Sequence, residues 1–179
     1  MKKLLVLFFL AMVLIPNPAT AQSPGDHIEL ADTLLWNDEY EKVKYHLQQA
    51  DSILTLAPDP DARLYYQIIL GDYYLDQQQY PQAAEAYEPL LKMKAHASEK
   101  MRLKLAKAIN DLGITYYHLG EMQRARTMHH QSLILYDGDL QGISYNYNNL
   151  AIIAKQQKTA GQRNCIFQEK SGSLHRPAG

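Results

Sequence analysis

Apolar residues recur along most of this chain at the spacing of amphipathic helices, with polar positions between them. Val43, Leu47, Ala50 and Leu54 show the pattern, because a period near 3.6 residues places all four on one side of a helix. Short segments rich in Pro, Gly or Asp, such as residues 58–60, interrupt the pattern. The pattern predicts no strand, and it predicts helices over about residues 28–35, 39–56, 61–75, 80–91, 98–119, 121–136 and 140–157.

Three single residues refine the predicted helix ends. Pro89 lies inside the helix at 80–91, where its ring should kink the helix or shorten it by a turn. Ser98 is placed to cap the next helix by accepting a hydrogen bond from a backbone N–H. Gly120 suits the left-handed conformation that ends many helices.

A small residue after leucine recurs about every forty positions. The pairs are Leu30-Ala31, Leu70-Gly71, Leu112-Gly113 and Leu150-Ala151, which lie 40, 42 and 38 residues apart. We call the small residue of each pair an anchor. A period in this range is typical of stacked helical hairpins. Twelve residues after the first three anchors comes another small or β-branched residue, and sixteen after them comes a larger one.

This pattern resembles the tetratricopeptide repeat, with the best match at Gly71, Tyr74, Ala83 and Tyr87. The anchors and the residues that carry the resemblance are Ala31, Gly71, Tyr74, Ala83, Gly113, Tyr116, Ala125 and Ala151. The resemblance implies an all-α, right-handed solenoid of antiparallel hairpins, about three and a half repeats long, over residues 22–157. A period near forty is similar to the exported sensor regions of bacterial histidine kinases and regulators that carry this repeat. A plain helical bundle and another two-helix solenoid stay open as alternatives.

The resemblance also implies a concave face lined by the first helix of each hairpin, which would bind a protein or peptide without catalysis. On the family's register the groove residues are Tyr65, Ile68, Asp72, Leu75, Asp76, Lys107, Asn110, Ile114, Tyr117, His118, Tyr145, Asn148, Ile152 and Lys155. Some family members clamp a terminal carboxylate with several basic residues. Here Asp72, Asp76 and Asp111 accompany Lys107, so we do not expect that clamp.

The two ends of the chain differ from its repetitive body. Lys2 and Lys3, the apolar run at residues 4–15 and the small residues at 19–21 predict a signal peptide over 1–21 and export, to a bacterial periplasm. A membrane anchor is the alternative, although the run is shorter than the ~20 residues of a spanning helix. Residues 158–179 are expected to be an irregular, disordered tail, because the repeat pattern stops there. A genuine cap and a truncated or frameshifted remnant of a longer chain are both open.

Loss of the repeat at residue 158 has a consequence for the helix before it. Tyr147, Leu150, Ala151 and Ala154 should lack a partner helix and leave an exposed apolar strip, which favours self-association. The alternative function is the input region of a bacterial membrane signal-transduction protein. Membrane signal-transduction proteins of this kind continue into a spanning helix and a kinase or DNA-binding domain.

Composition excludes several other classes of protein. Residues 22–157 carry more Asp and Glu than Lys and Arg, which argues against nucleic-acid binding. The lone Cys165 cannot form an internal disulfide. His129 and His130 are adjacent, so a helix points them apart; we expect them on the surface or at an interface, not at a metal. No motif for a catalytic nucleophile, a cofactor or a metal is present, and we expect no enzyme activity.

Overall fold

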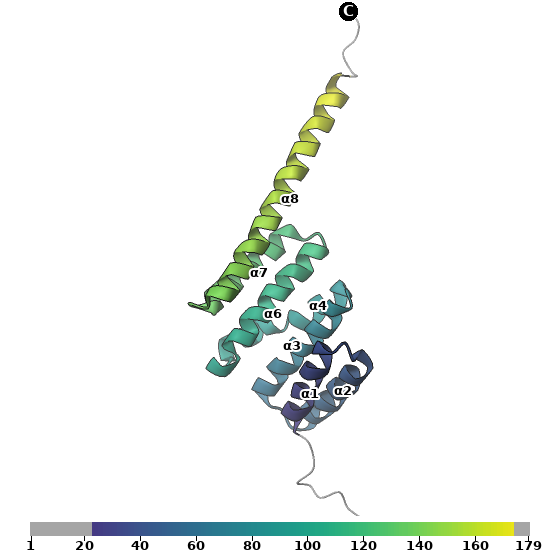
Figure 1. The fold of residues 1–179 in the computed structure, drawn as a ribbon, viewed down its shortest axis with the longest axis vertical. Helices are drawn as coiled ribbons and strands as arrows, with labels where there is room; N and C mark the ends of the chain where they lie inside the picture. The colour runs from purple at the N-terminus through teal and green to yellow at the C-terminus, as the bar shows by residue number, and fades with distance from the viewer. Residues whose placement is uncertain (1–22, 174–179) are drawn as a thin grey trace, which may run out of the picture.

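The computed structural model describes residues 23–173, which form helices joined by short turns (Figure 1). The predicted all-α fold is confirmed, and the predicted helices are found near their expected bounds, except that the last one extends well beyond residue 157. In chain order the helices are α1 (Pro24–Trp36), α2 (Tyr40–Leu56), α3 (Pro60–Asp76), α4 (Tyr80–Tyr87), α5 (Leu90–Met93), the 3₁₀ helix η2 (Lys94–His96), α6 (Glu99–His118), α7 (Met122–Tyr136) and α8 (Leu140–Ser173).

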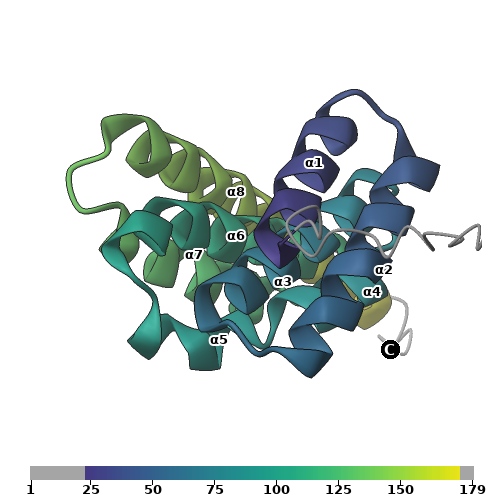
Figure 2. The same ribbon diagram turned by 90° about the horizontal axis from the view of Figure 1, so that it is seen from below.

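The helices pair into hairpins that stack in chain order. Helix α1 packs on α2, α3 on α4, and α6 on α7. The first helices of the hairpins also contact one another in the order α1, α3, α6 and α8, while the second helices contact the first helix of the following hairpin. Figure 2 shows α1 and α8 at opposite sides of the stack, with α3 and α6 between them. None of the helices within residues 23–173 is both long and apolar enough to cross a membrane.

The second and third hairpins close where the anchor meets the residue sixteen positions later. A Cβ atom added to Gly71 would lie 2.2 Å from Cε1 of Tyr87, and one added to Gly113 would lie 2.7 Å from Cε1 of His129. These two anchors have no room for a Cβ atom because an aromatic or imidazole ring lies against the helix backbone. Twelve residues after the first three anchors, Val43, Ala83 and Ala125 are fully buried. At Gly71 and Gly113 the closest approach is nevertheless made by the ring sixteen positions on.

Local signals in the sequence explain several helix ends. Helix α4 stops at Tyr87 and α5 starts at Leu90, as the proline between them predicts. Gly120 has a φ of +81°, which confirms the left-handed stop after α6. Ser98 is the N-cap of α6, but its buried hydroxyl forms no hydrogen bond, so the predicted capping bond is wrong.

The last helix departs from the earlier ones. Helices α1, α3 and α6 each end five residues after their anchor, whereas α8 continues from Ala151 to Ser173 and projects from the stack (Figure 1). The prediction of an irregular tail is therefore wrong for residues 158–173. That segment contains two glycines and no proline, and its Lys, Gln, Arg and Ala residues favour a helix. The predicted signal peptide at 1–21 and residues 174–179 lie outside the described residues.

The face of α8 around its anchor is uncovered. Ala151 and Ala154 are exposed, Tyr147 is 61% exposed and Leu150 is half-buried, which confirms the predicted apolar strip. The equivalent anchors Ala31, Gly71 and Gly113 are buried. This difference arises because α8 runs on without turning back into a second helix.

Candidate peptide-binding groove

Three adjoining hollows run across the first helices of the hairpins. The acidic end lies between α1, α3 and α6, with a volume of about 330 Å³, and is lined by Asp32, Leu35, Trp36, Asp72, Leu75, Asp76, Lys107 and Asp111. The middle is lined mainly by α6 and α8 and shares Lys107 and Asp111 with the acidic end. The apolar end shares Ile114 and Asn149 with the middle. Shared lining residues make the three hollows one continuous groove.

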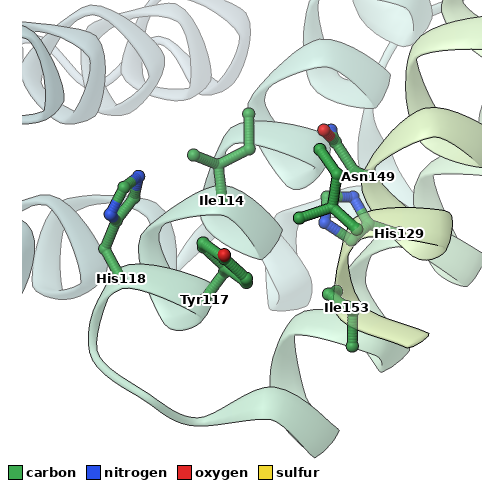
Figure 3. Close-up of a pocket in the computed structure, with 7 residues that line it drawn as sticks. Ile114, Tyr117, His118, His129, Asn149 and Ile153 are labelled. Carbon is green, nitrogen blue, oxygen red and sulfur yellow. The ribbon is translucent and has the colours of Figure 1, made fainter. Parts of the chain in front are cut away.

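The apolar end is a small cavity of about 150 Å³ between α6, α7 and α8 (Figure 3). Its lining residues are Ile114, Tyr117, His118, His129, Asn149, Ile152 and Ile153. Ile152 is 51% exposed, whereas Ile153 and His129 are buried at its base. The cavity therefore offers an apolar opening of the size of a single aliphatic side chain.

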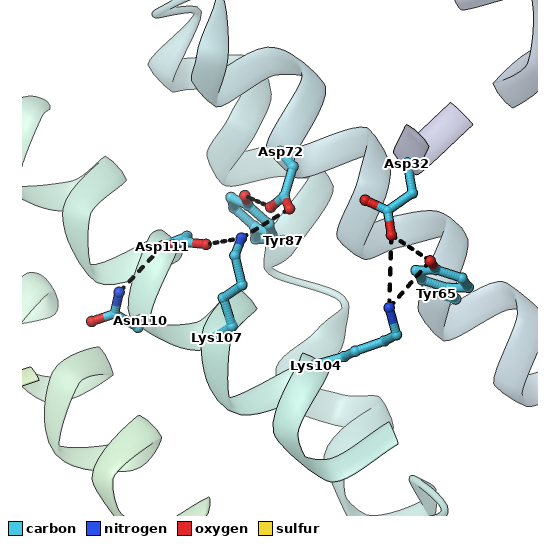
Figure 4. A network of polar contacts seen from close by, with 8 residues as sticks. All are labelled: Asp32, Tyr65, Asp72, Tyr87, Lys104, Lys107, Asn110 and Asp111. Atoms are coloured by element: carbon cyan, nitrogen blue, oxygen red, sulfur yellow. Dashed lines mark hydrogen bonds and ion pairs between the residues drawn. The ribbon is translucent and has the colours of Figure 1, made fainter. Parts of the chain in front are cut away.

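An ion-pair network crosses the acidic end (Figure 4). The Lys107 ammonium group donates to Asp72 at 3.0 Å and to Asp111 at 2.7 Å, which joins α6 to α3. The Tyr87 hydroxyl donates to the other oxygen of Asp72. Through these contacts the ring that covers Gly71 also fixes a groove carboxylate.

The charges in this network shift one another's protonation. Burial raises the pKa of Asp72, and Lys107 opposes that rise. Burial lowers the pKa of the Lys107 ammonium group, but Asp111 and Asp72 together raise it by more, so the net shift is upward. Burial and then the neighbouring Asp72 raise the pKa of Asp76. The acidic end thus holds more carboxylates than its cations neutralise.

A second polar cluster joins α1, α3 and α6 beside the acidic end. The Tyr65 hydroxyl donates to Asp32, and the Lys104 ammonium group lies 3.7 Å from Asp32 and 3.2 Å from the Tyr65 oxygen (Figure 4). These residues align the three helices. Lys104 therefore partly neutralises Asp32 without entering the lining of the groove.

A buried polar network fixes α8 against α6 and α7. His129 Nδ1 lies 3.1 Å from Asn110 Oδ1 and 3.3 Å from Asn146 Oδ1. Asn146 Nδ2 donates to Ser132 and to the Gly142 carbonyl, so its oxygen faces the histidine and Nδ1 carries the proton. Burial lowers the pKa of His129, which keeps the ring neutral.

Most of the predicted groove residues line the groove. Ten of them do so: Asp72, Leu75, Asp76, Lys107, Asn110, Ile114, Tyr117, His118, Tyr145 and Ile152. Ile68 is 3% exposed and belongs to the core, so its prediction as a groove residue is wrong. Tyr65, Asn148 and Lys155 lie outside the lining of these hollows.

Several residues that line the groove were not predicted from the sequence, among them Asp32, Leu35, Trp36 and Asn149. The signal for the first three was present. They follow Ala31 by one, four and five residues, as Asp72, Leu75 and Asp76 follow Gly71.

The two adjacent histidines, His129 and His130, differ in their burial. His129 is buried in the network above, which corrects its expected surface position, whereas His130 is exposed. Within residues 23–173 no group of three or more His, Cys, Asp or Glu side chains is placed to hold a metal ion.

The stacked hairpins and the groove across their first helices define a helical-repeat protein. The sequence model of the tetratricopeptide repeat family matches residues 105–136, which cover most of α6 and all of α7. For this hairpin, the match supports the tetratricopeptide repeat family that the anchor pattern indicated. No curated protein matches the chain. Repeats of this family are generally non-catalytic scaffolds that mediate contacts between proteins.

Proposed function

We propose that this protein binds an extended peptide segment of a partner protein in the groove across α1, α3, α6 and α8. The observation that carries the proposal is the continuity of the groove together with its exposed apolar side chains. Trp36 is 90% exposed, Tyr145 55% and Ile152 51%. Aromatic and aliphatic groups held open on a rigid scaffold are typical of protein-interaction sites.

The groove is poorly suited to a terminal carboxylate. Lys107, the lysine that lines it, is already held by Asp72 and Asp111. An incoming carboxylate would meet the oxygens of both aspartates. An internal segment of a partner chain fits the charge of the groove better.

A peptide-library selection tests the proposal. We would immobilise residues 22–157, the body that contains the groove, only after circular dichroism shows that it folds like the full chain. Random twelve-residue peptides that bind would then be titrated against the full chain, with the emission of Trp36 as the readout. Trp36 is the single tryptophan of the sequence, so with tryptophan-free peptides the signal comes from the surroundings of Trp36.

Matched variants localise the binding. Tyr145→Ala and Ile152→Ser together should weaken the selected peptides at least tenfold, because both side chains line the groove. Ile134→Ser removes an apolar side chain of α7 that is 78% exposed outside the groove, and should leave binding unchanged. Equal losses in both variants, or no selected binders, would refute peptide binding in the groove.

We also propose that the protein is exported and that its signal peptide is removed before Gln22. The basic start, the apolar run and the small residues at 19–21 support this. Sequencing the N-terminus of the protein recovered from a periplasmic fraction tests it. A mature chain that still begins at Met1 would contradict cleavage.

Self-association through the strip on α8 is a separate part of the proposal. Ala151→Glu should abolish concentration-dependent dimerisation in light scattering, while Ile134→Glu on α7 should not.

The alternative role, as the input region of a membrane signalling protein, is favoured by the long extension of α8 beyond its anchor. Reading the adjoining DNA in all three frames for a spanning segment distinguishes these roles.

A further inference from the structure

Equivalent positions in successive repeats give the two ends of the groove opposite chemistry. One residue after each anchor comes Asp32, then Asp72, then Ile114 and Ile152. Each of these four residues lines the groove. The groove therefore changes from acidic to aliphatic in the middle of the array, and a segment lying along it meets both surfaces.

The acidic end carries an excess of negative charge. Asp32, Asp72, Asp76 and Asp111 line it, with Lys107 among them and Lys104 beside it. The two lysines contact Asp32, Asp72 and Asp111, so Asp76 is the carboxylate that they do not pair with. Asp76 lies at the end of α3, facing the same hollow as Trp36.

Trp36 extends the acidic end with an aromatic surface. It is the last residue of α1, and the described part of the chain leaves its side chain 90% exposed. An indole face beside carboxylates suits a side chain with an apolar stem and a cationic head, because the ring attracts cations and contacts methylene groups.

We infer that the occupant of the groove is a peptide segment with a Lys or Arg side chain at the acidic end and an aliphatic side chain in the apolar end. This inference rests on the proposed function of the groove and adds the chemistry of its partner. The acidic end is centred on α3 and the apolar end lies between α6 and α8, which is one and a half helix spacings away. Neighbouring packed helices lie ~8–10 Å apart, so the two ends are separated by roughly 12–15 Å. An extended chain covers that distance in about four to five residues.

The library selection that tests peptide binding also tests this chemistry. The selected peptides should be enriched in Lys or Arg with Leu, Ile or Val about four to five residues away. Replacing the basic residue of a selected peptide by Gln should weaken its binding roughly three- to tenfold, as expected for a partly exposed charge pair. Raising the salt concentration should weaken the parent peptide more than the Gln peptide.

A mutant cycle assigns the charge contact to a side chain. Asp76→Asn should reduce affinity for the basic peptide about threefold or more and leave the affinity of the Gln peptide unchanged. Glu85→Gln removes an equally exposed carboxylate from α4, outside the groove, and should change neither. Circular dichroism of each variant checks that its fold is retained.

The possible failures are distinguishable. Peptides that need Tyr145 and Ile152 but are acidic or neutral would overturn this inference and leave peptide binding in place. Basic peptides that respond equally to Asp76→Asn and Glu85→Gln would also overturn it, because general charge attraction would then explain them. An absence of groove-dependent binders would refute the proposed function and the inference together.

Discussion

The contact between Gly71 and Tyr87 makes a sharp prediction for a single methyl group. In Gly71→Ala the new Cβ would lie 2.2, 2.4 and 2.6 Å from three carbons of the Tyr87 ring, well inside van der Waals contact. The ring is fully buried, and its hydroxyl is bonded to Asp72. It cannot move by the required ångström without losing that bond or separating α3 from α4.

The expected cost follows from three terms. Overpacking of a core costs typically ~1–3 kcal/mol. Losing a hydrogen bond to a charged group costs about 1.5–3 kcal/mol. Alanine favours the helical backbone over glycine by about 1 kcal/mol, which offsets part of this cost. We expect Gly71→Ala to reduce the free energy of unfolding by roughly 2–4 kcal/mol.

Urea unfolding followed by circular dichroism measures this change, and Gly25→Ala provides the control. Gly25 lies in the first turn of α1, and a Cβ there would meet only the Ser23 hydroxyl at 3.5 Å, an ordinary contact. The same substitution should therefore be neutral or stabilise by a few tenths of a kcal/mol. In a Tyr87→Leu background, Gly71→Ala should lose most of its cost. A neutral Gly71→Ala in the parent chain would refute the argument from close approach.

Other perturbations test separate parts of the structure. Burial lowers the pKa values of His46 and His129, so the unfolded chain binds their protons more readily and stability should fall as pH drops below about 6.5. Urea midpoints at pH 7.5 and 5.5 measure this, and His129→Gln should reduce the difference whereas His130→Gln should not. The Arg124 guanidinium lies 3.9 Å from the Tyr116 ring centroid and donates to Glu88, so Arg124→Lys should cost about 1 kcal/mol in the same assay. Gly120→Ala should cost ~1 kcal/mol because of its positive φ, and Gly120→Asn less.

The sequence was sufficient to predict the hairpins because local and repeated signals agreed. Apolar periodicity gave the helices, and the anchors gave the register of one hairpin on the next. The error at residues 158–173 has a simple cause. Loss of the repeat pattern says that no further hairpin is built, but it does not say that the backbone stops being helical when its residues still favour a helix.

The groove was harder to predict because neighbouring positions on a helix point about 100° apart. Ile68 and Asn110 both precede their anchor by three residues and both are buried, yet Ile68 belongs to the core whereas Asn110 lines the groove. Asp111 and Asn149, one position later in the register, line the groove. Sequence periodicity identifies the apolar side of a helix. It does not tell which of the residues beside that side contact a neighbouring helix and which face solvent.

The ion pairs of the acidic end could not be predicted from local patterns. Lys107 and Asp72 are 35 residues apart, and their contact depends on the lateral spacing of α3 and α6. The anchor register places both near the concave face but gives no distance between them. Whether Lys107 is available to a ligand therefore becomes clear only from the structure.

His129 connects the stability of the array to the shape of the groove. Its ring covers Gly113, bonds Asn110 and Asn146, and lines the apolar end. The preceding repeat uses Tyr87 at the equivalent position, where the ring meets a carboxylate instead of two amides. A buried polar network tolerates few alternative arrangements, because each misplaced partner leaves a group without a hydrogen bond. The position of α8, and with it the opening between Ile114 and Ile152, is thus set by a neutral histidine that the earlier hairpins do not need.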